Sequence, residues 1–389
     1  MKLNLAILGS TGSIGKSLLN IISKDKKKFK ISLLTANSNY QLILEQAKKF
    51  NVKNIIITDK KCFDLARSKN KTKNLNIFNN FQNLEKIFKN KIDYVMSSIV
   101  GLDGLDPTFK IIKHTKKVAI ANKESIICAW NLIKKELKKH NTEFIPVDSE
   151  HFSIWHTLRN SSKDNIEKLY LTASGGPLLK TPLKKFQNLK INKIIKHPNW
   201  KMGAKISVDS ATMMNKVFEV MEAKKIFDLN YNQISILVHP HSYLHAILKF
   251  KDGMINSIAH ETTMEIPINN TLGKFKNDQI KFKKIDVNKL NNLQLSDIDK
   301  KKFPVVNLLN KLPANDSLFE TVLVSVNDHL VNLLLNHEIT YLELIEKLSK
   351  ILSKKEFKKY KFIEPKKITD ILNLNKILKS KIIHDKKII

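Results

Sequence analysis

The stretch Leu3-Asn4-Leu5-Ala6-Ile7-Leu8-Gly9-Ser10-Thr11-Gly12-Ser13-Ile14-Gly15 decides the fold of this chain. An apolar segment, residues 3–8, reads as a strand and runs directly into a loop with glycines at positions 9, 12 and 15, which opens a helix. Glycine permits the tight turn and lets the backbone approach a pyrophosphate held at the helix N-terminus. The chain has only ten glycines, so three within seven residues favour a nucleotide-binding loop over a structural turn.

Outward from this loop, short apolar segments alternate with helical ones through the first 150 residues. Such alternation is typical of a parallel, doubly wound sheet, and it predicts a Rossmann-like domain. The expected strands are Leu3–Leu8, Lys30–Leu34, Asn54–Thr58, Asp93–Ser97, Val118–Ala121 and Glu143–Val147.

In the rest of the chain the pattern of expected helices and strands changes at two points. From 151 to 285 helices mix with strands at 168–172, 233–237 and 246–250, which predicts an α+β domain with a largely antiparallel sheet. Residues 286–312 are polar and read as a linker. The helical periodicity of Leu318–Leu335, Tyr341–Leu352 and Ile368–Ile383 predicts a C-terminal helical bundle. We therefore expect an α/β protein with domains at 1–150 and 151–285, a linker at 286–312 and a bundle at 313–389.

The chain is strongly basic, with 68 Lys and Arg against 36 Asp and Glu, a net charge of +32. Such a charge is typical of proteins that bind nucleic acid or anionic membranes. Here the excess is mostly Lys, spread along the whole length with abundant Asn and Ile, as an AT-rich genome would produce. No basic motif is interleaved with aromatic residues, so we expect no nucleic-acid partner and no membrane partner.

The cellular compartment is predicted from three further features. The two cysteines cannot form a disulfide framework and suit a reducing environment. The apolar runs fall short of the roughly 20 residues of a membrane helix. The start of the sequence resembles neither a signal peptide nor an organelle leader. These features predict a cytoplasmic protein.

The end of the second expected strand indicates the type of cofactor. An NAD-binding domain usually places an acidic residue about 20 residues beyond the loop, where it holds the ribose hydroxyls. This chain has Asn37, Ser38 and Asn39 there, with hydrogen-bond donors and no carboxylate. The pattern favours a 2′-phosphate, and hence NADP.

Three acidic residues suggest a metal site. Asp148 and Glu150 are one residue apart, and on an extended segment both would point to the same face. Glu219, on a later helix, would complete a set of three carboxylates suited to Mg²⁺ or Mn²⁺.

Polar residues near these acids suit a phosphorylated substrate. Asn215 and Glu219 are four residues apart on a helix that Asp209 or Ser210 could cap, so they share a face and Lys216 lies beside them. Lys123, after the strand that ends at 121, could contact a substrate oxygen, although a Lys–Glu pair at a helix start is more often a surface feature. Ser174 opens a Gly-Gly loop that could form an anion-binding nest, or an ordinary turn.

Two groups of aromatic side chains allow more than one interpretation. Trp200, flanked by Pro, Lys and Gly, could belong to a mobile flap that excludes water or to a core. His239 and His241 would share a strand face as zinc ligands do, with His245 nearby. Because no Cys or Asp completes a ligand set, we favour a role in packing or in an interface for these histidines and predict no metal there.

Together these motifs resemble one family, the 1-deoxy-D-xylulose 5-phosphate reductoisomerases, over nearly the full length. The motifs that carry the resemblance, in the family's order and spacing, are Gly-Ser-Thr-Gly-Ser-Ile-Gly, Ala-Asn-Lys-Glu-Ser, Pro-Val-Asp-Ser-Glu-His, Ser-Gly-Gly-Pro, His-Pro-Asn-Trp and Ser-Val-Asp-Ser-Ala-Thr-Met-Met-Asn-Lys. The resemblance implies a homodimeric enzyme of the non-mevalonate isoprenoid pathway. It would rearrange 1-deoxy-D-xylulose 5-phosphate and reduce it with NADPH to 2-C-methyl-D-erythritol 4-phosphate, with a divalent metal as Lewis acid.

The resemblance also implies roles for individual residues. The residues that would contact the cofactor are Thr11, Gly12, Ser13, Ile14, Asn37, Ser38, Asn39, Asn122, Glu124 and Gly203. The residues that would bind the metal are Asp148, Glu150 and Glu219. The residues that would bind the substrate are Lys123, Ser149, Glu150, Ser174, His197, Ser210, Asn215, Lys216 and Glu219. The catalytic residues would be Lys123, Asp148, Glu150, His197 and Glu219, and Trp200 and Met202 would form the flap.

The chain departs from the family pattern after residue 250. The usual Gln-Leu-Gly and Pro-Asp-Met stretch is replaced by His260-Glu261-Thr262-Thr263-Met264.

The alternative interpretation among enzymes is an NADP-dependent dehydrogenase of homoserine or malate type, which would leave the three carboxylates without a role. A basic nucleic-acid-binding protein would explain only the charge.

Overall fold

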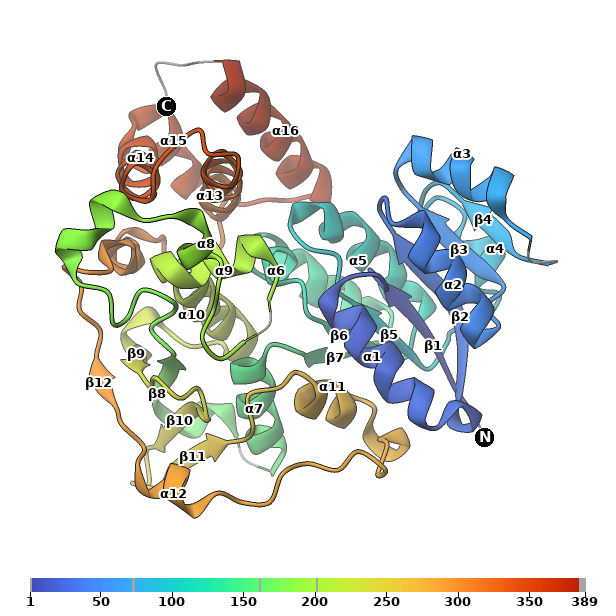
Figure 1. The fold of residues 1–389 in the computed structure, drawn as a ribbon, viewed down its shortest axis with the longest axis horizontal. Helices are drawn as coiled ribbons and strands as arrows, with labels where there is room; N and C mark the ends of the chain where they lie inside the picture. Colours follow the sequence, from blue (N-terminus) through green and yellow to red (C-terminus); the bar gives the residue numbers. More distant parts are fainter. Residues whose placement is uncertain (1, 72–73, 161, 201, 385–389) are drawn as a thin grey trace. The chain divides into compact units, whose positions relative to one another are not determined.

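Seven parallel strands form the first sheet of the computed structural model (Figure 1), which describes residues 2–71, 74–160, 162–200 and 202–384. The strand order is β4-β3-β2-β1-β5-β6-β7. All six strands predicted for this region are present, and the expected doubly wound α/β domain is confirmed. The strands are β1 (Leu3–Leu8), β2 (Phe29–Ala36), β3 (Asn54–Ile57), β4 (Asn76–Phe78), β5 (Tyr94–Ser97), β6 (Lys117–Ile120) and β7 (Glu143–Pro146).

The chain divides into two compact units, and the first contains this sheet. It comprises residues up to 125, 133–152 and 263–282. The late segment is tied to the early one, because Asn277 donates a hydrogen bond to the carbonyl of Ile21 and the hydroxyls of Tyr94 and Thr271 lie 2.8 Å apart. Its helices are α1 (Ser13–Lys24), α2 (Tyr40–Phe50), α3 (Lys60–Lys69), α4 (Leu84–Ile87), α5 (Leu105–Ile111), most of α6 (Lys123–Lys139), the first turn of α7 (Ser149–Thr157) and α11 (Glu265–Thr271).

The second unit comprises residues 126–132, 153–262 and 283 onward, and it contains a five-stranded sheet of order β11-β10-β8-β9-β12. Only the β8–β9 pair is parallel, which confirms the expected, largely antiparallel sheet. The edge strands β11 and β12 were not predicted. The strands are β8 (Ile166–Ala173), β9 (Ile234–Val238), β10 (Leu244–Phe250), β11 (Ile255–Ala259) and β12 (Ser296–Asp297).

Helices cover this second sheet and form a cluster beyond it. One buried face of α10 packs on the sheet through Val220, Ala223 and Phe227. Figure 1 shows α13, α14, α15 and α16 gathered at one end of this unit. These helices lie within residues 313–389, for which the sequence predicted a C-terminal helical bundle. The helices are α8 (Ile191–Ile194), α9 (Ala204–Thr212), α10 (Met214–Phe227), α12 (Val287–Asn291), α13 (Phe319–Leu335), α14 (Tyr341–Ser353), α15 (Lys355–Lys358) and α16 (Ile368–His384).

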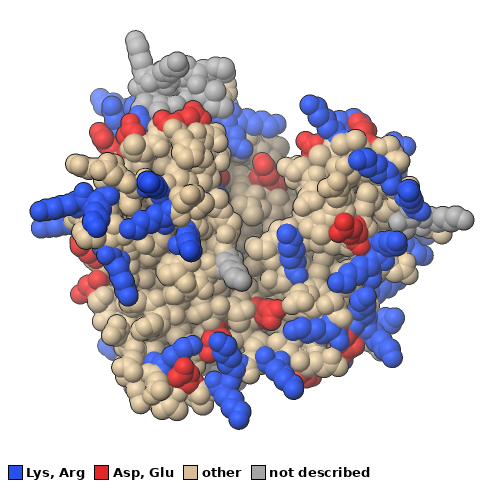
Figure 2. Space-filling view, viewed as in Figure 1, with Lys and Arg blue, Asp and Glu red and all other residues tan. Residues whose placement is uncertain are grey.

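The surface agrees with the dispersed charge expected from the sequence. Figure 2 shows Lys and Arg scattered over the visible face among fewer acidic side chains. Within the described ranges, no helix is both long and apolar enough to cross a membrane.

Candidate active site

The glycine loop is built as a nucleotide-binding turn. Gly9 has φ of +86°, which glycine adopts without strain, and a Cβ on Gly15 would lie 2.4 Å from the carbonyl oxygen of Gly9. Gly12 precedes the first residue of α1, so the N–H groups of that helix's first turn face the loop. Thr11 and Ile14 are half-buried, and Gly12 and Ser13 are exposed. The four residues predicted to bind the cofactor therefore lie together at one accessible helix N-terminus.

The three polar residues predicted near the adenosine end follow β2 directly, and all are exposed. Asn39 caps α2, because its side chain accepts a hydrogen bond from the Leu42 N–H. Asn37 accepts one from the Thr58 hydroxyl at 3.0 Å. No carboxylate stands among the three, which agrees with the NADP cofactor that the sequence favours.

The start of α6 is held by the buried side chain of Asn122. Its oxygen accepts from the Ser125 N–H, and its nitrogen donates to the carbonyls of Ile99 and Gly101 at 2.6 and 2.9 Å. Glu124 is also buried, with a carboxylate oxygen 3.3 Å from the same amide nitrogen. Asn122 thus joins the ends of two adjacent strands, and its contact with a cofactor stays a prediction.

Lys123, the first residue of α6, is not a surface feature. Its ammonium lies 3.0 Å from a carboxylate oxygen of Asp148, and its side chain is 13% exposed. The inference from helix-start statistics, which favoured the surface, is therefore wrong for this lysine.

The expected extended geometry of Asp148 and Glu150 is also wrong. Strand β7 ends at Pro146 and α7 begins at Ser149, so Glu150 lies in the first turn of a helix. The Asp148 carbonyl accepts the Phe152 N–H, and its carboxylate accepts the Ser149 N–H at 3.0 Å. The two acids are neighbours because a strand passes directly into a helix, not because strand side chains alternate.

Ser174 and His197 form a hydrogen-bonded pair in the second unit. The Nδ1 atom of His197 accepts the N–H groups of Asn199 and Trp200, so its proton is on Nε2, which donates to the Ser174 hydroxyl oxygen at 3.0 Å. That oxygen also accepts the Gly176 N–H. The hydroxyl hydrogen of Ser174 is then directed to a further acceptor, such as a phosphate oxygen. Burial lowers the pKa of His197 to about 4, so the ring is neutral at neutral pH.

The residues predicted to bind phosphate lie around a break between two helices. Asp209 and Ser210 belong to the last turns of α9, and Met213, with φ of +66°, separates α9 from α10. The prediction that Asp209 or Ser210 caps the following helix is therefore wrong; Asp209 is buried and accepts from the Asn327 amide at 2.8 Å. A Cβ on Gly176 would lie 2.5 Å from the Ser210 carbonyl oxygen, so the Ser174 loop rests against the end of α9.

The first turns of α10 carry the shared face predicted from the sequence. The Asn215 amide and the Lys216 ammonium each donate to a carboxylate oxygen of Glu219. Lys216 and Glu219 are buried, and Asn215 is half-buried. A buried Lys–Glu pair with an amide beside it is a preorganised polar cluster.

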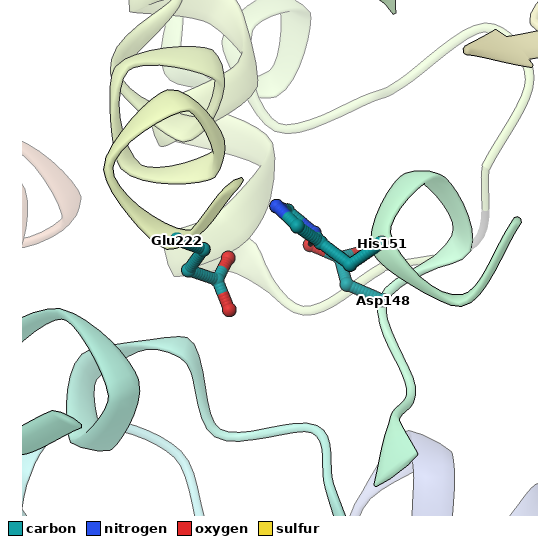
Figure 3. Close-up of side chains that lie close together, drawn as sticks. All are labelled: Asp148, His151 and Glu222. Carbon is teal, nitrogen blue, oxygen red and sulfur yellow. Dashed lines mark ion pairs between the residues drawn. The ribbon is translucent and has the colours of Figure 1, made fainter. Parts of the chain in front are cut away.

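Two groups of three side chains bring potential metal-ligating atoms close together, one group of three carboxylates and one of two carboxylates and an imidazole. Asp148, Glu150 and Glu219 each offer one oxygen, and these oxygens lie within 4.8 Å of one another. A second group consists of Asp148, His151 and Glu222, with the same spacing; Figure 3 shows His151 and Asp148 at the start of α7 and Glu222 on α10. The first set fits a hard divalent cation, which prefers carboxylate oxygens. His151 and Glu222 were missed, although each lies three residues after a predicted ligand and hence on the same helical side.

The remaining predicted residues have simpler surroundings. Ser149 donates its hydroxyl to Glu150 at 2.6 Å. Gly203 is exposed at the start of α9, and a Cβ at this position would meet no heavy atom within 4 Å. His239 and His241 follow β9 rather than sharing a strand face, since β9 ends at Val238. Their rings meet edge to face, and Nδ1 of His239 donates to the Gln294 carbonyl.

Comparison with known proteins identifies chains that are similar over nearly the whole length. Three family descriptions match in order: 1-deoxy-D-xylulose 5-phosphate reductoisomerase over residues 5–130, its C-terminal domain over 144–227, and DXP reductoisomerase C-terminal domain over 260–381. Proteins named 1-deoxy-D-xylulose 5-phosphate reductoisomerase are similar to it: that of Pelagibacter ubique at 55% identity, covering 97% of this chain and 98% of its own, and that of Wolbachia pipientis wMel at 37%, covering 98% of each.

Solved structures agree with the sequence comparison. A DOX-P reductoisomerase in complex with NADPH, fosmidomycin and magnesium is 30% identical, with a TM-score of 0.88 over 98% of this chain and 97% of its own. The reductoisomerase of Zymomonas mobilis in complex with NADPH is 28% identical, with a TM-score of 0.85 over 98% of both chains.

Proposed function

The chain belongs to the 1-deoxy-D-xylulose 5-phosphate reductoisomerase family, and we propose that it catalyses the reaction for which that family is named. It rearranges 1-deoxy-D-xylulose 5-phosphate and reduces the product with NADPH to 2-C-methyl-D-erythritol 4-phosphate, in the non-mevalonate route to isoprenoid precursors. The three clustered carboxylates Asp148, Glu150 and Glu219 carry this proposal, because a simple dehydrogenase has no use for them.

The three carboxylates hold Mg²⁺ or Mn²⁺ in this proposal. Their charge and spacing fit such an ion, which acts as a Lewis acid on the substrate's carbonyl and adjacent hydroxyl. Lys123 orients Asp148 through its 3.0 Å contact. Ser149 holds the Glu150 carboxylate in place through its hydroxyl. In the same way, Asn215 and Lys216 fix the carboxylate of Glu219.

The first sheet provides the cofactor site. NADPH supplies the hydride. The N–H groups at the start of α1 and the residues Thr11, Gly12, Ser13 and Ile14 bind the pyrophosphate, and the donors at 37–39 bind the 2′-phosphate. Asn122, Glu124 and Gly203 complete the contacts.

The substrate phosphate is bound by hydrogen-bond donors of the second unit: Ser174, His197, Ser210, Asn215 and Lys216. The neutral ring of His197 positions the Ser174 hydroxyl, which donates to the phosphate. Lys123 and Ser149 contact the sugar. The loop that carries Trp200 and Met202 closes over the site and excludes water, so that binding energy of the phosphate positions the reacting carbons.

The domain organisation, the oligomeric state and the cellular compartment of the protein form part of the same proposal. Residues 1–150 form the NADPH-binding domain and also supply Lys123, Asp148 and Glu150. Residues 151–285 form the catalytic and dimer-forming domain, although 263–282 pack within the first compact unit; 286–312 form the linker and 313–389 the bundle. A homodimer is supported by β11, a sheet edge on which Ile255 is 59% exposed. The reducing cytoplasm suits Cys62 and Cys128, which are not joined in a disulfide.

The test follows NADPH absorbance when 1-deoxy-D-xylulose 5-phosphate is added with Mg²⁺ or Mn²⁺, with and without a chelator. We expect oxidation that depends on the metal, and a branched polyol phosphate as the product by mass spectrometry. An ordinary dehydrogenase would instead oxidise NADPH with no metal requirement and no change of carbon skeleton.

Substitution of one ligand tests the assignment of the metal. We expect Glu219→Gln to abolish turnover and leave NADPH affinity unchanged, because the substitution alters the metal site and the contacts of Glu219 with Asn215 and Lys216 but not the glycine loop. Glu338→Gln, at an exposed position, is the control and should behave as the wild type. Turnover that survives in Glu219→Gln would remove Glu219 from the metal site.

A further inference from the structure

His245 and His260 stack face to face in the second unit. Their ring centroids lie 3.6 Å apart, and the rings are inclined by only 18°. Nε2 of His245 donates to the His260 carbonyl oxygen at 3.2 Å, and Nδ1 of His260 donates to the Glu261 carbonyl oxygen at 2.8 Å. Hydrogen bonds to two carbonyls therefore fix the orientation of both rings.

A β-bulge directs His245 out of the regular strand pattern. In the pairing of β10 with β11, Leu244 lies opposite Ala259 and Ala246 lies opposite Ile258, so His245 is an extra residue on the β10 side of the ladder. Bulges of this kind re-aim a side chain and recur beside functional sites. The His245 side chain is buried, and the indole of Trp200 meets its ring edge to face at 6.3 Å.

The segment before Trp200 is anchored to the turn that precedes β10. The Asn199 amide donates to the Pro240 carbonyl at 2.7 Å and to the Ser242 hydroxyl at 2.9 Å. Ser242 has φ of +52°, an uncommon conformation for this residue type. The loop from His197 to Trp200 therefore has a fixed base, and the Trp200 ring is directed toward His245.

His260 is held from the other side by the segment that departs from the family pattern. Its N–H donates to the Tyr243 carbonyl at 3.0 Å, and the Thr262 hydroxyl donates to the Ser242 carbonyl at 3.1 Å. Lys289 lies 3.3 Å from a Glu261 carboxylate oxygen and over the Tyr243 ring. The backbone around His260 is thus fixed independently of its imidazole.

We propose that His260 is a positioning residue for the flap: its ring supports His245, and the stacked pair is the platform on which Trp200 rests. The proposal builds on the proposed function, since the flap closes over the sugar phosphate. His260 does not touch the substrate; it acts through His245 and Trp200. An aromatic pair of this kind changes an equilibrium constant by about 2- to 10-fold, and here that equilibrium is closure of the flap.

Steady-state kinetics of three variants test the proposal. His260→Ala removes the stack, and we expect KM for the sugar phosphate to rise about 3- to 10-fold while kcat changes less than about twofold. His260→Phe keeps a flat ring but not the hydrogen bond to Glu261, and should restore KM to within about twofold of the wild type. His241→Ala, an exposed histidine of the same turn, is the control and should leave KM unchanged. A wild-type KM in His260→Ala, or no restoration by His260→Phe, overturns the proposal.

Fluorescence provides a test that needs no turnover. The emission of Trp200 is obtained as the difference between each protein and the same protein with Trp200→Phe, because Trp130 and Trp155 also emit. We expect acrylamide to quench this difference emission more strongly in His260→Ala than in the wild type or in His260→Phe. Equal quenching in all three overturns the proposal. Because this readout is independent of catalysis, an inactive wild-type enzyme would contradict the proposed function and leave the role of His260 measurable.

Discussion

The ammonium nitrogen of Lys123 lies 3.0 Å from the nearer carboxylate oxygen of Asp148. The pair joins the first residue of α6 to the residue before α7, so the ends of two adjacent strands present a cation and an anion to each other. A divalent cation at Asp148 therefore shares this carboxylate with a positive charge that is already present.

Because Lys123 and a metal ion would share the Asp148 carboxylate, we expect Lys123→Met to strengthen metal binding and to weaken substrate binding. The substitution removes the ammonium that competes with the ion, so we expect the dissociation constant for Mn²⁺ to fall by about fivefold. We expect kcat/KM for the sugar phosphate to fall by about 10- to 150-fold, as loss of a hydrogen bond from a charged donor implies. Calorimetry and steady-state kinetics measure the two. Lys113→Met, in an exposed pair with Glu85, should change neither, and weaker Mn²⁺ binding in Lys123→Met would contradict the competition.

His197 predicts a pH dependence of stability. Burial lowers its pKa from 6.5 to about 4 in the folded protein. Above pH 6.5 the ring is neutral in both states, whereas between 6.5 and 4 the unfolded chain takes up the proton and the folded protein does not. The contribution of His197 to the free energy of unfolding is therefore fully present above pH 6.5 and is lost as the pH falls toward 4.

The measurement compares urea unfolding of the wild type and His197→Gln between pH 4.5 and 7.5. We expect the free energy of unfolding to fall less steeply in the variant below pH 6.5, and the two curves to run parallel above it. Parallel curves over the whole range would mean that the ring is protonated equally in both states.

The close approach at the glycine loop predicts a steric effect. A methyl group on Gly15 would lie 2.4 Å from the Gly9 oxygen and 2.6 Å from the Ser10 Cα, which are both backbone atoms. We expect Gly15→Ala to lower the free energy of unfolding by about 3 kcal/mol, near the upper end for overpacking. Gly203→Ala meets no atom within 4 Å and should cost at most about 1 kcal/mol. Equal melting temperatures for the two variants would contradict the steric reason.

The buried charges around Lys225 predict a large effect outside the active site. Lys225 contacts Asp316 and lies 3.3 Å from Glu320, and the side chains of Lys225 and Glu320 are 4% and 3% exposed. Lys225→Met leaves Glu320 without its cation, so we expect a loss of about 3–5 kcal/mol in denaturant unfolding. Lys60→Met, in the exposed pair with Asp64, should cost less than about 1 kcal/mol. A loss below about 1 kcal/mol in Lys225→Met would mean that Glu320 is solvated by water or takes up a proton, to which burial already inclines it by raising its pKa.

Local patterns predicted the parts of this protein that local interactions form. The strand–loop–helix at 3–24 follows from its apolar run and glycine spacing, and the Asn215–Glu219 contact follows from helical periodicity. Strands β4 and β12 were missed because they have only three and two residues and pair with residues far along the chain. Strand β11 was missed although it forms a hairpin with the neighbouring β10. The helix that begins at Ser149 was missed although Asp148 is a common residue type at helix starts.

Other features depend on the folded chain as a whole. The residue at the break between α9 and α10 is Met213, whereas Gly or Asn usually occupies a left-handed position at a helix end. Because the sequence carries no such residue there, Asp209 and Ser210 were predicted at the start of a helix rather than at its end. The stack of His260 on His245 depends on a bulge in a strand pair. The return of residues 263–282 to the first unit depends on contacts with residues far earlier in the chain, such as Ile21.

The lysines scattered over the surface in Figure 2 bear on how quickly the proposed substrates arrive. A sugar phosphate and NADPH are both anions, and they diffuse toward a molecule whose net charge is +32. Long-range attraction of this kind raises the rate of encounter and weakens as ionic strength increases. We therefore expect the lysine-rich composition to speed capture at low salt, whatever its genomic origin.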